Sequence, residues 1–217
     1  MAFLVTGVVG SVVIVVLAAF AKDARYHLAP LFLVPLLWAG YFLRRRLHVL
    51  PLHYFFFLVA ILLHELGAFG YYQKSPLPFS YDIAVHYWFG FVGTLVFERA
   101  LRLSFPVLKT WHTRVAAGLF VMGIGAIHEI VEYMSYLMFK EKGMMHPDVM
   151  YFFDTQRDLT DNLAGAITAL MLITIFAWWR RRNDATAFNV LPPHAADHGS
   201  TGQSSVRNGD AGRPAPL

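Results

Sequence analysis

The sequence predicts an all-α fold: a polytopic membrane helical bundle of about six transmembrane helices with both termini in the cytoplasm. Of the 217 residues, 57% are hydrophobic and only 15% are charged, and the mean hydropathy is +0.48. This composition is typical of membrane proteins rather than soluble domains. In addition, apolar runs long enough to cross a bilayer alternate with short polar connectors, several of which are rich in arginine.

The first two apolar runs differ in regularity. Residues 2–21 are apolar throughout and predict a retained helix, because no basic residue precedes them. A cleaved signal peptide is the alternative, since Ala19-Phe20-Ala21 before Lys22 resembles a cleavage site. The second run, residues 28–43, contains Pro30 and Pro35 and is expected to form a kinked span.

The next four spans carry polar residues inside apolar runs. They are predicted near residues 49–68, 82–103, 115–139 and 159–179, and residues 140–158 are predicted to be the longest internal loop. The last span ends at an interfacial pair of tryptophans followed by three arginines. Residues 1–182 therefore form the predicted transmembrane domain, and the polar residues 183–217 a disordered cytoplasmic tail.

The basic residues indicate which ends of the spans face the cytoplasm. With the N-terminus inside, ten lysines and arginines fall in inner segments and six in outer ones. Since cytoplasmic segments carry an excess of Lys and Arg, both termini are placed inside. The net charge of +4 is thus interpreted as a topology signal, and nucleic acid is not an expected partner. The inner residues are Arg44, Arg45, Arg46, Arg99, Arg102, Lys109, Arg114, Arg180, Arg181 and Arg182.

This topology brings polar residues from four spans into the outer leaflet. The third and fifth spans end at the outer face, and the fourth and sixth begin there. Reversing the orientation would move the whole set to the inner face but would keep it together. The set contains seven carboxylates and three histidines: His64, Glu65, Asp82, His86, His128, Glu129, Glu132, Asp154, Asp158 and Asp161.

Helical spacing indicates that these side chains share faces. Asp82 and His86 are four residues apart, as are His128 and Glu132, so each pair lies on one side of a helix. Three aspartates near the sixth span are likewise spaced by four and three residues. Acids at this depth are costly unless a partner or a cation compensates them. Carboxylates and imidazoles from facing helices also build the metal sites of helix bundles. The pattern therefore predicts a cation site.

The absence of cysteine limits the metal. Histidine, aspartate and glutamate favour Zn, Mn, Fe or Mg. We expect the catalytic residues to be Glu129, Asp158 and Asp161. The expected metal ligands are His64, Asp82, His86, His128, Glu132 and Asp154.

Purely structural interpretations compete for some of these residues. Asp82 precedes an apolar run and would serve equally as a helix cap. His64 and Glu65 near a helix end would form an interfacial pair. By contrast, Glu129 and Glu132 lie a turn apart inside a span and are hard to explain as ordinary surface, so they favour function.

Several short motifs lie between residues 60 and 175. They are Tyr81-Asp82-x-x-x-His86, Gly90-Phe91, Glu98, Glu129-x-x-Glu132, Asp154-Thr155-Gln156-x-Asp158 and Gly165-Ala166. Together they resemble the YjdF-like bacterial inner-membrane proteins, although His128 stands where an aromatic residue is expected and a Gly-Thr-Gln-Gly-Asp-like segment is missing before Asp154. Asp161-Asn162 with Gly165 is similar to the last helix of VanZ-like proteins. The resemblance implies a multi-pass protein of the bacterial inner membrane and brings no established activity.

Three functions are consistent with these features. The first is a metal-dependent membrane enzyme acting on a lipid or a small amphiphile. The second is an ion- or proton-coupled transporter, in which the same carboxylates titrate in turn. The third is a noncatalytic membrane partner protein whose polar core only fixes helix packing. The lipid bilayer is the expected surrounding in all three.

Overall fold

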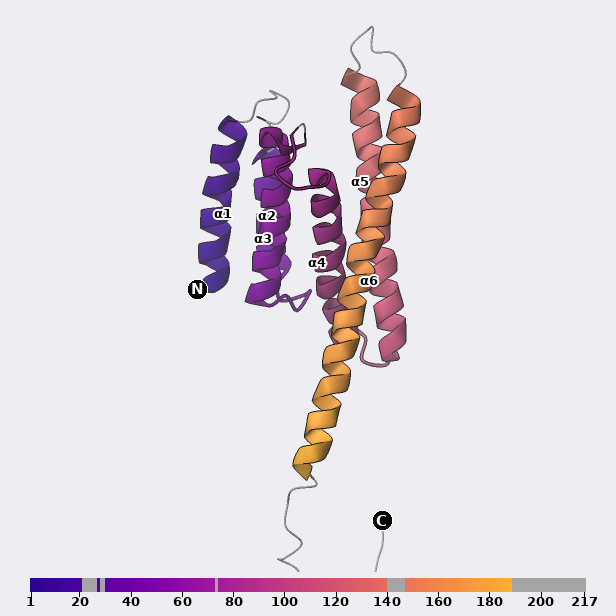
Figure 1. Ribbon diagram of the computed structural model, residues 1–217. Helices are drawn as coiled ribbons and strands as arrows, with labels where there is room; N and C mark the ends of the chain where they lie inside the picture. Colours follow the sequence, from indigo (N-terminus) through magenta and orange to yellow (C-terminus); the bar gives the residue numbers. More distant parts are fainter. Residues whose placement is uncertain (21–26, 28–29, 73, 140–146, 189–217) are drawn as a thin grey trace, which may run out of the picture. The chain divides into compact units, whose positions relative to one another are not determined.

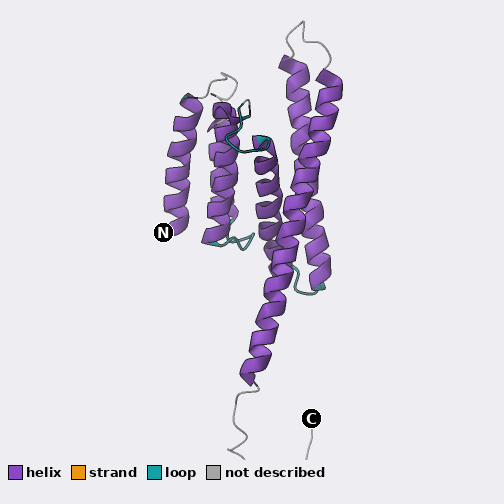
Figure 2. Cartoon of the chain, viewed as in Figure 1, coloured by secondary structure: helices purple, strands orange, loops and turns teal. Residues whose placement is uncertain are grey.

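The chain folds as a series of helices joined by short loops (Figures 1 and 2). A computed structural model describes residues 1–20, 27, 30–72, 74–139 and 147–188. Within these residues the regular structure is helical, which confirms the predicted all-α class. The helices are α1 (Ala2–Ala19), α2 (Pro30–Leu43), α3 (Pro51–Leu66), the π-helical turn η2 (Gly67–Tyr71), α4 (Tyr81–Ser104), α5 (Thr110–Phe139) and α6 (Pro147–Phe188).

Three of the described helices contain segments long and apolar enough to cross a membrane, namely Ala2–Ala19, Thr110–Val131 and Phe153–Asn183. α2 and α3 are also apolar but shorter. α4 has 24 residues and carries several charged side chains along its length. The protein is thus built from membrane-spanning helices, and the count of six spans stays a prediction.

α1 and α3 pack side by side and run in the same direction (Figure 1). A Cβ at Gly7 would lie 3.2 Å from the Tyr54 hydroxyl, and one at Gly10 would lie 2.6 Å from a Leu58 methyl. Small residues let helix backbones approach closely in this way. The Tyr54 hydroxyl donates a hydrogen bond of 3.0 Å to the carbonyl of Leu37 on α2. The core of these helices is Ile14, Leu37, Tyr54, Leu58 and Ile61, hereafter the apolar cluster.

Glycine allows still closer packing among α4, α5 and α6. A Cβ at Gly90 of α4 would overlap the backbone carbonyl of Asn162 on α6. A Cβ at Gly165 of α6 would in turn overlap the carbonyl of Tyr87 on α4. On α5, a Cβ at Gly125 would lie 2.7 Å from the Asn162 side-chain nitrogen. The three helices therefore meet around Asn162, at positions where even alanine is too large.

The sixth helix begins earlier than predicted. Residues 140–158 are expected to form a loop, yet α6 begins at Pro147, so the loop prediction is wrong for residues 147–158. Proline is suited to this place because the first residues of a helix need no backbone N–H partner. As a result, Asp154 and Asp158 lie within the helix rather than before it.

Residues 1–177 form one compact unit, and the described residues 178–188 belong to a second. In the second unit, the Arg182 guanidinium lies 5.5 Å from the centroid of the Trp178 ring. This contact joins the predicted aromatic anchor to the basic cluster that follows it. The tail was predicted from residue 183; α6 continues to Phe188, and residues 189–217 lie outside the described residues.

Candidate functional site

The beginning of α4 supplies an acid and a histidine on one face. Asp82 and His86 are one turn apart, and Asp82 Oδ1 lies 3.4 Å from His86 Nε2. Ser80 precedes the helix without a side-chain capping bond, and the Asp82 carboxylate faces His86 instead. His86 is only 8% exposed, so its imidazole lies inside the bundle.

α6 brings a second acid to the same imidazole nitrogen. Asp158 is 2% exposed, and its Oδ2 lies 3.8 Å from His86 Nε2. One donor atom each from Asp82, His86 and Asp158 therefore falls within 4.8 Å of the others. We call these three residues the triad.

α5 approaches the other side of the imidazole. Glu129 is 5% exposed, and its Oε1 lies 3.9 Å from His86 Nδ1. The two ring nitrogens thus face different carboxylates, with Nε2 toward the triad acids and Nδ1 toward Glu129. At 3.9 Å this is an electrostatic contact rather than a hydrogen bond, and it favours a proton on Nδ1 with Nε2 toward the two aspartates.

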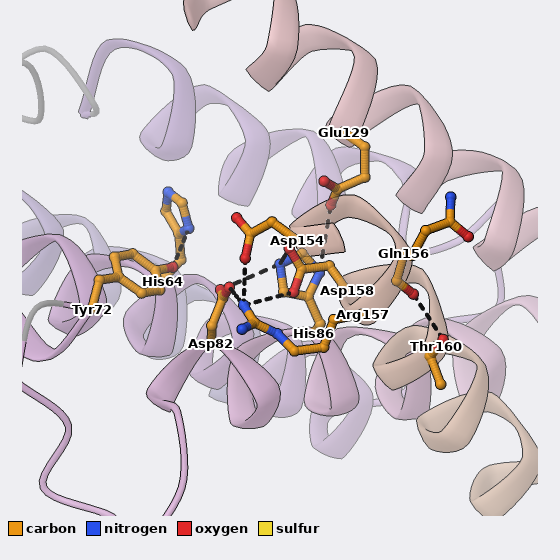
Figure 3. A network of polar contacts seen from close by, with 10 residues as sticks. All are labelled: His64, Tyr72, Asp82, His86, Glu129, Asp154, Gln156, Arg157, Asp158 and Thr160. Atoms are coloured by element: carbon orange, nitrogen blue, oxygen red, sulfur yellow. Dashed lines mark hydrogen bonds and ion pairs between the residues drawn. The ribbon is translucent and has the colours of Figure 1, made fainter. Parts of the chain in front are cut away.

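Arg157 joins the acids at the outer edge of the triad (Figure 3). Its Nη2 lies 2.9 Å from Asp82 Oδ2, 3.5 Å from Asp158 Oδ1 and 2.6 Å from Asp154 Oδ1. Asp82 and Asp158 therefore each direct one oxygen to Arg157 and the other to His86. The Arg157 and Asp154 side chains are 41% and 51% exposed, so the site opens on this side.

The spacing within the triad suits a shared cation. Two ligand atoms about 2.1 Å from one ion and separated by about 110° lie roughly 3.4 Å apart. The distances from His86 Nε2 to the two aspartates, 3.4 Å and 3.8 Å, are close to this value and too long for good hydrogen bonds. Three carboxylates contact Arg157 here and a fourth, that of Glu129, faces His86, so a cation would relieve the excess of negative charge.

Two further histidines approach His86 from other helices. The ring centroids of His86 and His128 are 6.1 Å apart, and those of His128 and His64 are 6.3 Å apart. His64 Nδ1 is hydrogen-bonded to the Tyr72 hydroxyl at 2.9 Å. The structure thus gathers all three predicted histidines, with His64 and His128 beside the triad rather than in it.

Other predicted residues are placed differently. Asp161 makes no hydrogen bond or ion pair with the triad among the described residues, and its Oδ2 is buried without a hydrogen-bond partner there. The side chain of Glu132 lies outside the described part of the chain, so its predicted role stays a prediction. Glu65 points away from its neighbour His64: it continues the buried row of Leu58 and Ile61 on α3.

Two side chains at the site were not among the predicted residues. The sequence analysis uses Arg157 only as an outer basic residue. Its position between Asp154 and Asp158 of α6 indicates an ion pair at the site. Asn162 is named in the sequence analysis only for its similarity to VanZ-like proteins. An amide four residues after Asp158 in an apolar run is unusual and indicates a buried polar role. Arg157 reaches Asp82 of α4, whereas the Asn162 side chain lies beside Gly125 of α5 and its backbone carbonyl lies against Gly90 of α4.

The fold and the site define a class: a helical membrane protein with an acid–histidine cluster inside its bundle. The chain belongs to the family described as "Predicted membrane protein (DUF2238)", whose model matches residues 1–181. This membership is consistent with the resemblance to the YjdF-like proteins, whereas the likeness to VanZ-like proteins stays a prediction. Neither the curated proteins nor the solved structures contain a match to the chain.

Proposed function

We propose that this protein binds a divalent cation at the triad and uses it in a reaction on a lipid or a small amphiphile. The observation that carries the proposal is the convergence of three donor atoms, from Asp82, His86 and Asp158, within 4.8 Å of one another. Because the donors are two carboxylates and one imidazole, Zn, Mn or Fe fits the set better than Mg.

Each residue then has a distinct part. Asp82, His86 and Asp158 bind the cation, and Glu129 holds the imidazole with Nε2 free to ligate. Arg157 neutralises the outer oxygens of the two aspartates. This proposal makes Asp158 a ligand and Glu129 a positioning residue, where the sequence alone suggested catalytic parts for both.

The exposure of the site is consistent with an enzyme. The cluster is reached past Arg157 and Asp154, which are partly exposed. On the other side of the triad, Gly90, Gly125 and Asn162 are all buried and closely packed. A site with one opening suits a reactant that enters and leaves by the same side, while a transporter would open the same site to the opposite face in a second conformation.

A bound cation would supply the chemistry that these side chains lack. It would lower the pKa of a coordinated water toward neutrality and polarise an oxygen of the reactant. Since the bundle is surrounded by lipid, the polar end of an amphiphile can reach the opening from the bilayer. The proposed substrates are therefore molecules with an apolar chain and a hydrolysable head group.

The first test is metal content. Detergent-purified protein supplied with Zn²⁺ or Mn²⁺ should retain about one ion per chain. Asp158→Asn should lose it, whereas Glu98→Gln should not, because Glu98 is a buried α4 carboxylate paired with Arg102. Metal content should also fall as the buffer is acidified, since ligands must be deprotonated. A wild-type protein that binds no metal, or equal metal in Asp158→Asn, contradicts the proposal.

The second test addresses the reaction. Metal-loaded protein would be incubated with vesicles of a mixed phospholipid extract, and the lipids compared by mass spectrometry with those exposed to Asp158→Asn. We expect a product that requires both the metal and Asp158. Metal binding without any such product would retain the cation site and remove the enzymatic part of the proposal.

A further inference from the structure

We propose that Asn162 is a fourth, neutral ligand of the cation, binding through its Oδ1 one helical turn deeper than Asp158. This inference rests on the proposed cation site and extends it to a residue of the inner, closed side. The ligand class is a divalent cation bound by two carboxylates, one imidazole and one amide oxygen.

The first observation is that the Asn162 amide is buried without a partner. Asn162 is 0% exposed, and neither Oδ1 nor Nδ2 has a hydrogen-bond partner among the described residues. Leaving such a group unsatisfied costs about 1–3 kcal/mol, so a buried amide normally has a partner. An apolar side chain would fill the same space more cheaply, which points to a ligand for the amide.

The second observation is the position of Asn162 relative to the triad. Asn162 follows Asp158 by four residues, so the two side chains lie on the same face of α6. Side chains on a helix lean toward its N-terminal end, which directs Asn162 toward Asp158 rather than away from it. α4 carries the same spacing in Asp82 and His86, so two neighbouring helices each offer one pair of donors.

The third observation is that glycines face Asn162 from two other helices: Gly125 of α5 lies beside its side-chain amide, and Gly90 of α4 lies against its backbone carbonyl. Gly90 follows His86 by four residues on α4, and Gly125 precedes Glu129 by four on α5. At these two positions α4 and α5 have no side chain, so neither competes with the Asn162 amide for room. The amide oxygen would complete a four-coordinate site without adding charge.

The test is a Zn²⁺ titration of detergent-purified protein, with calorimetry to give the dissociation constant. Asn162→Ala should weaken Zn²⁺ binding at least tenfold, because one ligand is lost. Asn162→Asp should restore binding to near the wild-type value or tighten it, because a carboxylate oxygen takes the same place. If Asn162 only fills space, Asn162→Ala and Asn162→Asp will leave the Zn²⁺ affinity of the folded protein unchanged, which would overturn the inference.

A matched pair of glycine variants tests the same idea without touching Asn162. A Cβ at Gly125 would lie 2.7 Å from Asn162 Nδ2 and must displace the amide, whereas a Cβ at Gly123 on the same helix meets nothing within 4 Å. Gly125→Ala should therefore weaken Zn²⁺ binding severalfold, and Gly123→Ala should not. Equal affinity in the two variants contradicts the inference, and this comparison remains decisive if Asn162→Ala does not fold.

The two proposals fail in different ways. If wild-type protein binds no Zn²⁺ or Mn²⁺, the cation site itself is wrong. If wild-type binds Zn²⁺ and loses it in Asp158→Asn but not in Asn162→Ala, the triad stands and only the fourth ligand is wrong.

Discussion

The apolar cluster of α1–α3 is packed in the same way as the polar cluster of α4–α6, which we define as the triad with Glu129, Arg157 and Asn162. The two clusters differ in the side chains that they contain. In both, glycines bring helices close, and rows of residues spaced by three or four face a neighbour. The apolar cluster contains one hydroxyl, that of Tyr54, and it is hydrogen-bonded. The polar cluster instead buries acids, a histidine and an amide, some of whose atoms have no hydrogen-bond partner among the described residues.

This difference in side chains indicates that the apolar cluster stabilises the fold and the polar cluster serves function. Well-packed apolar groups contribute to stability and need no ligand. Buried polar groups that are incompletely paired reduce stability, and they persist when function requires them. We therefore expect substitutions in the apolar cluster to change folding alone, and substitutions in the polar cluster to change cation binding as well.

The largest expected effect on folding is in the apolar cluster. Leu37 is 0% exposed, so Leu37→Ala should reduce the free energy of unfolding by about 2–5 kcal/mol, through lost packing and the cavity left behind. Zn²⁺ bound per folded chain should stay at the wild-type value. Thermal unfolding in detergent and elemental analysis of the folded fraction check the two parts. Loss of metal from the folded fraction would contradict the idea that the apolar cluster affects folding alone.

Gly90→Ala should affect both folding and binding. The added Cβ overlaps the Asn162 carbonyl, so α4 and α6 must separate, at a cost of about 1–3 kcal/mol. Because His86 and Asp158 lie on these two helices, Zn²⁺ affinity should fall as well. Gly118→Ala is the control, since its Cβ would make only an ordinary contact of 3.9 Å with Leu170. A Gly90→Ala protein with normal stability and affinity would show that the close approach is not needed.

Removing the Arg157 side chain should increase the affinity of the polar cluster for Zn²⁺. Arg157 binds the outer oxygens of Asp82 and Asp158 and repels a nearby cation, so Arg157→Gln should tighten Zn²⁺ binding by roughly tenfold at low salt. Arg157→Lys keeps the charge and should resemble wild type. Calorimetric titration at two salt concentrations measures the effect, which should shrink at the higher one. Weaker binding in Arg157→Gln would mean that the arginine mainly positions the ligands.

The smallest expected effect concerns the one acid in the α3 row. Glu65 is 1% exposed and neither carboxylate oxygen has a hydrogen-bond partner in the described part of the chain. Replacing it with leucine removes an unpaired polar group, so Glu65→Leu should leave the unfolding free energy within about 1 kcal/mol of wild type or raise it. Thermal unfolding is the measurement. A large loss of stability would reveal a polar partner for Glu65 and place it with the functional residues.

The sequence was sufficient for the class of fold and for the approach of the polar residues of several helices to one another. Helix connectivity alone brought the ends of α3, α4, α5 and α6 together, and the four-residue spacing placed Asp82 and His86 on one face. These inferences depend only on span length and helical period, which are local properties.

What the sequence could not give was the rotation of each helix about its own axis. His64 and Glu65 are adjacent in the chain, yet His64 lies toward His128 while Glu65 continues the row of the apolar cluster. Asp158 and Asp161 were predicted to act together, yet only Asp158 contacts His86. Close contacts at Gly7, Gly10 and Gly40 restrict the rotation of α3, and those at Gly90, Gly125 and Gly165 restrict α4, α5 and α6; they become visible only in three dimensions.

Arg157, at the outer edge of the triad, affects how the helices of this protein assemble. The Arg157 guanidinium of α6 links that helix to α4 through Asp82, and it also contacts Asp154 and Asp158 of its own helix. The contact between α4 and α6 is thus made by the chain's own side chains and needs no ion. With the proposed cation site, assembly of the helices would therefore not depend on metal supply, and metal-starved cells should still contain the folded protein.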